Sequence, residues 1–261
     1  MNDFGLSIVV AMTGWWFFTG LILWLVHWPR SRHLGVFAVT SLLSLVTFAS
    51  VPSVGAWTGG MASVTAFCQA LILWGWLEMA YLMGFMTGPE GRPCELNAGL
   101  LIRAKSGLKA CLYNELGTVG IGVSLITLLW GAANPTAVWA FCALWFMRWS
   151  AKLNLVLGVR NYNRSWLPEH LAYVDSYIPR RRMNPLFPVS VLVGTTLAWW
   201  LGVLAAGAPD LGSRVSLTLV CTLVTLGTLE HVFLMLPLNE AALWRWASPG
   251  PNKKVAISLE K

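Results

Sequence analysis

Seven long apolar stretches follow one another along the chain, and each is long enough to cross a lipid bilayer. The hydrocarbon core of a bilayer is about 30 Å thick, so a spanning helix needs about 20 apolar residues. A helix also pairs its own backbone N–H and C=O groups, as a membrane requires. The stretches are Leu6–Trp28, Leu34–Val51, Ala62–Thr87, Leu108–Gly131, Pro135–Gly158, Leu186–Ala208 and Val215–Leu238. The sequence therefore predicts an all-α, polytopic membrane protein, a bundle of about seven transmembrane helices.

Composition supports this fold class and a single domain. Charged residues make up only 11% of the 261 residues, whereas soluble domains carry about 25%. No polar region is long enough to form a soluble domain. We therefore expect one transmembrane domain over residues 1–247 and a cytoplasmic tail over residues 248–261. The five Cys residues show no CxxC spacing, so neither a disulfide framework nor a zinc site is expected.

The distribution of basic residues predicts the orientation of the bundle. Of the 18 Lys and Arg residues, only Arg214 falls on the side of the membrane that would hold the N-terminus. All the others fall on the opposite side, or in the half of the fifth stretch nearest to it. Basic residues concentrate on the cytoplasmic side of a membrane, so we expect a periplasmic N-terminus and a cytoplasmic C-terminus. The net charge of +7 thus indicates contact with membrane lipid, not nucleic acid.

The longest polar connection lies between the fifth and sixth stretches, on the predicted cytoplasmic face. Apolar residues recur in it at helical spacing, at Leu167, Leu171, Val174 and Ile178. This spacing predicts one amphipathic helix, Trp166–Ile178, which lies in the membrane interface with Glu169 and Asp175 turned outward. A basic block then follows and would contact anionic lipid. The other candidate residues of this face are His170, Arg180, Arg181 and Arg182.

Polar and charged residues inside the apolar stretches form the candidate site. A charge at the bilayer centre costs about 2.5–3.5 kcal/mol on insertion scales, so such groups should face the bundle interior and pair. The predicted topology places them all in the cytoplasmic half, at similar depth. The members of this intramembrane polar cluster are Glu78, Glu115, Arg148, Lys152, Asn154, Glu230 and His231.

Three interpretations of the intramembrane polar cluster are open. The first is structural, with ion pairs and hydrogen bonds that fix helix packing. The second is a ligand or pigment site, with His231 or His27 as an axial ligand to a chlorin magnesium. The third is a metal site built from Glu78, Glu115, Glu230 and His231, although the Glu-x-x-His motif of di-iron bundles is absent. No catalytic residue is predicted, because the chain has no Walker loop, GxSxG, HExxH or Rossmann glycine pattern.

Several long segments resemble a known family. They are WGWLEMAYLMGFMTGP (74–89), LYNEL (112–116), KLNLVLGVRN (152–161), LPEHLAYVDSYIPRRRMNPLFPVSV (167–191) and TLEHVFLMLPLNEAALWRWA (228–247). These segments resemble the photosynthetic complex assembly protein 2 family of the PuhE type, whose members are encoded beside the reaction-centre H subunit in phototrophic bacteria. The resemblance extends from the first apolar stretch to Ala247.

The resemblance implies a role in making the photosynthetic apparatus and no settled chemistry. Together with the predicted fold, we expect a non-catalytic protein of the bacterial inner (intracytoplasmic) membrane. It would assist assembly of the photosynthetic reaction centre or antenna, or modulate bacteriochlorophyll supply to them. The implied partners are photosynthetic complex subunits or pigment-synthesis enzymes, and the implied ligand is bacteriochlorophyll or a precursor. The alternative is a membrane metalloenzyme that acts on a pigment or isoprenoid through the Glu/His cluster. A transporter with a proton or anion path is a third possibility.

Overall fold

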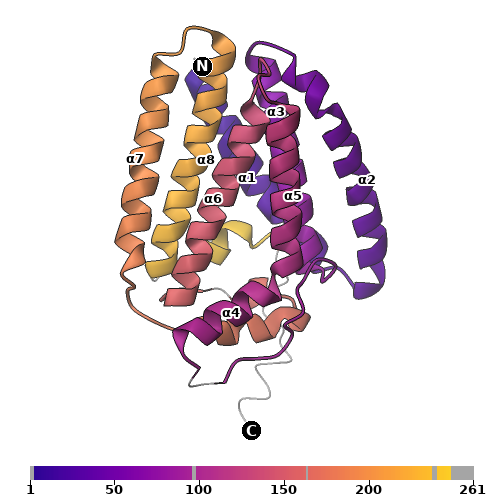
Figure 1. The fold of residues 1–261 in the computed structure, drawn as a ribbon, viewed down its shortest axis with the longest axis vertical. Helices are drawn as coiled ribbons and strands as arrows, with labels where there is room; N and C mark the ends of the chain where they lie inside the picture. Colours follow the sequence, from indigo (N-terminus) through magenta and orange to yellow (C-terminus); the bar gives the residue numbers. More distant parts are fainter. Residues whose placement is uncertain (1–2, 96–97, 163, 237–239, 248–261) are drawn as a thin grey trace.

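The computed structural model describes residues 3–95, 98–162, 164–236 and 240–247, and within these ranges the chain forms helices and no β-strand. Figure 1 shows long helices side by side, with α4 (Leu100–Ala110) lying across one end of the bundle. The bundle helices are α1 (Asp3–Val26), α2 (Arg30–Gly55), α3 (Gly60–Leu82), α5 (Leu112–Leu128), α6 (Thr136–Leu157), α7 (Leu186–Ala206) and α8 (Leu211–Met235). Each predicted apolar stretch overlaps one of these helices.

Five of the bundle helices, α1, α2, α3, α7 and α8, are long and apolar enough to cross a membrane. The bent pair α4–α5 makes a sixth if it counts as one span. The remaining bundle helix, α6, carries Arg148 and Lys152 and packs against α3 and α8. The predicted all-α, polytopic membrane fold is confirmed, with five to six candidate spans among the described residues.

The bundle has a packed centre and a lipid-facing periphery. About half of the most apolar window of α3 and of α8 is buried, against 17% for α2 and for α7. Phe67, Leu125, Phe141 and Leu219, from four helices, are fully buried in the central cluster. The exposed side chains of α2 and α7 are largely apolar. They suit a hydrocarbon solvent, where exposure of an apolar group carries no hydration cost.

The fourth apolar stretch was predicted to be one helix that begins at Leu108, and this prediction is wrong. It divides at Cys111 into α4 and α5, which meet at an angle of 63°. The cause is a tertiary contact, because the backbone N–H of Gly88 donates to the carbonyl of Ala110 (2.9 Å) at the bend. Most of the basic, amphipathic helix α4, residues 100–107, was not predicted and lies in the connection between the third and fourth apolar stretches.

The predicted single helix Trp166–Ile178 is also wrong. The segment forms two 3-10 helices, η1 (Arg164–Trp166) and η2 (Glu169–Tyr177). Pro168 separates them, because it has no N–H to donate and it disfavours the helical conformation of the residue before it. The apolar residue Leu171 is buried in a cluster with Tyr81 and Cys111, so η2 packs on the end of the bundle beside α4.

Residues 240–247 fold back along α1, starting with the 3-10 helix η3 (Glu240–Trp244). The indole of Trp244 donates to the carbonyl of Trp16 (3.0 Å), and the indole of Trp16 donates to the carbonyl of Leu243 (2.9 Å). The ring of Trp246 covers Gly20 so closely that a Cβ there would lie 2.1 Å from it. The predicted tail, residues 248–261, lies outside the described residues.

The contact at Gly88 predicts a large effect of one methyl group. A Cβ at this position would lie 1.5 Å from the carbonyl oxygen of Lys109, so Gly88→Ala must displace the backbone at the α4–α5 bend. We expect a loss of roughly 1–3 kcal/mol of stability, as for other overpacked sites, measured as a lower thermal unfolding midpoint in detergent. Gly91→Ala, in the same connection with nothing within 4 Å of its Cβ, is the control. Equal midpoints for the two variants would contradict this account of the bend.

Candidate functional site

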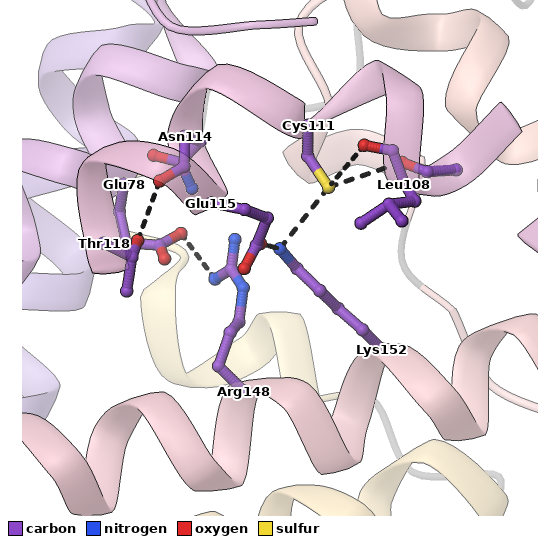
Figure 2. A network of polar contacts seen from close by, with 9 residues as sticks. Glu78, Leu108, Cys111, Asn114, Glu115, Thr118, Arg148 and Lys152 are labelled. Carbon is purple, nitrogen blue, oxygen red and sulfur yellow. Dashed lines mark hydrogen bonds and ion pairs between the residues drawn. The ribbon is translucent and has the colours of Figure 1, made fainter. Parts of the chain in front are cut away.

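Helix α6 presents two cations on one face, near the end of the bundle that α4 covers. Arg148 and Lys152 are four residues apart, so they project from the same side of the helix. Arg148 pairs with Glu78 of α3, and Lys152 pairs with Glu115 of α5. Figure 2 shows both pairs together, with the two basic side chains extending from α6. Two ion pairs therefore join three helices at one level.

Both carboxylates of these pairs are well shielded. The side chains of Glu78 and Glu115 are 12% and 9% exposed, and those of Arg148 and Lys152 are 31% and 23% exposed. Removing such charges from water carries a penalty of several kcal/mol per ion, which only a well-placed partner offsets. Each cation here has one carboxylate, so these four groups compensate one another without an additional ion.

The α4–α5 bend adds polar atoms to this pair layer. Lys152 also donates to the sulfur of Cys111 (3.7 Å), and the Cys111 thiol donates to the carbonyl of Gly107 (3.3 Å). Asn114 is 2% exposed, and its Oδ1 has no hydrogen-bond partner among the described residues. Sequence analysis did not select Asn114 or Cys111. Their adjacency to Glu115 within an apolar stretch was the available signal.

Glu230, the third carboxylate of the intramembrane polar cluster, contacts α1. It comes from α8 and accepts a hydrogen bond from the indole of Trp15 on α1 (3.2 Å). Trp15 also packs edge-on against Trp244, with 5.3 Å between ring centres. Glu230 therefore belongs to the contact between α1, α8 and the returning C-terminal segment. No sequence pattern indicated the Trp15 partner, because the contact joins opposite ends of the chain.

His231 belongs to a third group, between α6, α7 and α8. Its Nδ1 donates to the carbonyl of Gly227 (2.7 Å), and its Nε2 lies 2.9 Å from the hydroxyl of Ser150. Ser150 and Asn154 both donate to the hydroxyl of Ser190 on α7 (3.1 and 2.9 Å). His231 and Asn154 are 1% and 0% exposed. Both ring nitrogens thus have protein partners, so axial ligation through His231 would require breaking one of these contacts.

The members of the intramembrane polar cluster therefore share one end of the bundle but form three separate groups. Among the residues that the structure describes, no three His, Cys, Asp or Glu side chains are placed to hold a metal ion. Glu78, Glu115, Glu230 and His231 do not converge, so the proposed four-ligand metal set has no geometric support. His27, the other candidate axial ligand, bonds through Nδ1 to the carbonyl of Leu23 (2.6 Å).

The predicted cytoplasmic residues lie around the α6–α7 connection. Arg180 pairs with Asp175 (2.9 Å) and stacks over the ring of Tyr162. Burial and the nearby Asp175 carboxylate raise the pKa of Tyr162 to about 12. Asp175 also pairs with Arg164 (2.7 Å) and so is not simply turned outward. Arg181 and Arg182 are exposed.

His170 faces Gly84, which adopts a φ of +91° at the end of α3. Its Nε2 is buried without a hydrogen-bond partner among the described residues. Burial, followed by the nearby charges of Arg30 and His33, lowers the pKa of His170. The His170 side chain of η2 therefore lies against the chain just after α3, whereas Arg181 and Arg182 of the same connection are exposed.

Comparison with known proteins establishes the family. The family described as "Protein of unknown function (DUF3623)" matches residues 1–255. The chain belongs to this family. It is also similar to the "Uncharacterized 30.4 kDa protein in puhA 5′ region" of Rhodobacter capsulatus, with 33% identity over 253 residues that cover 95% of this chain and 92% of the relative. No solved structure matches the chain.

The ion pair of Lys152 and Glu115 predicts that removing one of its charges destabilises the protein more than removing both. Glu115→Gln leaves the shielded ammonium of Lys152 without its carboxylate, and we expect the free energy of unfolding to fall by roughly 3–5 kcal/mol. Glu115→Gln combined with Lys152→Met removes both charges and should recover most of that loss. Unfolding midpoints of the purified variants measure both effects. Glu169→Gln, the same change at an exposed position, is the control, and a double variant no more stable than Glu115→Gln would contradict the pairing.

Proposed function

We propose that this protein is a bacterial inner-membrane factor that assists assembly of the photosynthetic reaction centre or antenna, or modulates bacteriochlorophyll supply to them, without catalysing a reaction. The observation that carries the proposal is the relative in Rhodobacter capsulatus, whose name places it in the puhA 5′ region. The similarity to it covers nearly all of both chains. The family resemblance in the sequence implies the same gene context, because members of that family are encoded beside the reaction-centre H subunit.

The geometry of the buried charges supports a non-catalytic role. Arg148 and Lys152 are each held by a carboxylate, and His231 is held at both ring nitrogens. A catalytic acid, base or metal ligand has to reach a substrate or an ion with a proton or a lone pair. The two ion pairs and the contact of His231 with Ser150 join side chains of neighbouring helices. They fix the relative positions of the helices, and so the shape of the surface offered to partners.

The end of the bundle formed by α4, η2 and the 178–182 segment is the proposed partner surface. It carries Arg103, Lys105 and Lys109 of α4 together with the exposed Arg181 and Arg182, and Figure 1 shows α4 spread across it. By the inside-positive bias this end lies in the cytoplasm, which antibody access to tags on the two termini would test. There it would meet nascent complex subunits or pigment-synthesis enzymes.

The near-infrared absorbance of whole phototrophic cells tests the proposal. Deleting the gene should lower the reaction-centre or antenna bands, or change their ratio, and the gene supplied in trans should restore them. Accumulation of one defined pigment intermediate in deleted cells would instead indicate an enzyme. An unchanged spectrum across several light and oxygen regimes would contradict any role in photosynthesis.

A further inference from the structure

A groove runs along the lipid-facing side of the α1–α2 hairpin, at the basic end of the bundle. It is a shallow, open groove with a volume of about 500 Å³. Its mouth holds Trp28, Ser31 and Arg32, and Leu25 and Val36 belong to its apolar wall. We propose that this groove binds one anionic phospholipid, with the phosphate at Arg32 and an acyl chain along the apolar wall. The proposal stands independently of the proposed function.

Arg32 has an exposed positive charge without an acidic partner among the described residues. Its guanidinium lies over the ring of Trp28, 5.5 Å from the ring centre, and it forms no ion pair with any carboxylate in the described residues. The sequence offers none nearby, since no Asp or Glu occurs between Asp3 and Glu78. Arg148, by contrast, has a carboxylate partner. The exposed cation therefore has no acidic partner among the described residues, and a lipid phosphate can serve as its counter-ion.

The start of α2 supports an anion at the same place. The first turn of α2 contains no acidic residue, and no side chain caps it. Helix N-termini attract negative charge through their free N–H groups and the helix dipole. Ser31, in this first turn, lines the groove beside Arg32 and adds a hydroxyl donor. Trp28 is of the residue type that favours the headgroup level of a membrane.

The apolar part of the groove defines the rest of the ligand. Gly35 lies on its floor, and a Cβ built there would have no atom within 4 Å. The helix that carries Gly35 is peripheral, with 17% of its most apolar window buried, so the groove opens toward lipid. A small soluble anion would leave the apolar wall uncovered, and a neutral lipid would leave Arg32 without a counter-ion. A phospholipid with a net negative headgroup satisfies both requirements.

The empty space at Gly35 allows a clean test. Gly35→Leu places a side chain in the groove, its Cβ meets no atom within 4 Å, and the change raises helix propensity, so the variant should fold. Gly120→Leu, at an exposed glycine of α5 with equally open space, is its control. Arg32→Gln removes the proposed phosphate contact, and Arg30→Gln removes a neighbouring charge that does not line the groove.

Native mass spectrometry of the purified full chain, with added phosphatidylglycerol or phosphatidylcholine, measures binding. Wild type, Gly120→Leu and Arg30→Gln should each retain one phosphatidylglycerol in preference to phosphatidylcholine. Gly35→Leu should lose this retention, and Arg32→Gln should weaken the preference about fivefold, as expected for one cation near an anionic headgroup. Equal retention by Gly35→Leu and wild type, or no preference for phosphatidylglycerol in wild type, would overturn the proposal. If Gly35→Leu fails to fold, the Arg32→Gln and Arg30→Gln pair decides.

Discussion

The pairing of the α6 cations is the interaction on which the rest of the bundle depends. A helix with Arg148 and Lys152 in its second half cannot lie against lipid at low cost. It must stand inside the bundle, next to helices that supply carboxylates. Glu78 of α3 and Glu115 of α5 do so, and these contacts account for the position of α6 between apolar neighbours. The more apolar helices α2 and α7 are consequently free to form the lipid-facing rim.

At the end of the bundle that α4 covers, the charges inside the bundle are ion-paired, whereas several arginines on its surface have no acidic partner among the described residues. Within the helices, the ion pairs and the His231 hydrogen bonds satisfy the polar atoms that fix helix packing. At the surface, Arg181 and Arg182 of the α6–α7 connection and Arg32 of the first turn of α2 are exposed and suit anionic partners. This division assigns stability to the interior and recognition to the surface. An assembly factor fits it well, because such a protein has to hold a shape that its partners recognise.

Sequence alone predicted the parts of the fold that depend on local composition. Each bundle helix was located because apolar length is a one-dimensional property of the chain. The same argument predicted that the buried charges lie toward one end of the helices. Their partners did not, since pairing Glu78 with Arg148 or Glu230 with Trp15 depends on the rotation of each helix about its axis. The bend between α4 and α5 was missed because it depends on a contact between Gly88 and Ala110, which are distant in the sequence. The segment of η2 was mistaken for an α-helix because its apolar spacing is helical, whereas Pro168 interrupts the helix.

Exchange of the Glu78 and Arg148 side chains tests the central claim most directly. Glu78→Arg alone and Arg148→Glu alone each place two like charges together and should sharply lower the unfolding midpoint of the purified protein. The double exchange restores an ion pair with its ends reversed, and the account predicts that it recovers more than half of the larger single loss. If the double exchange lowers the unfolding midpoint by as much as the two single changes added together, the claim that this pair holds α6 in place is contradicted.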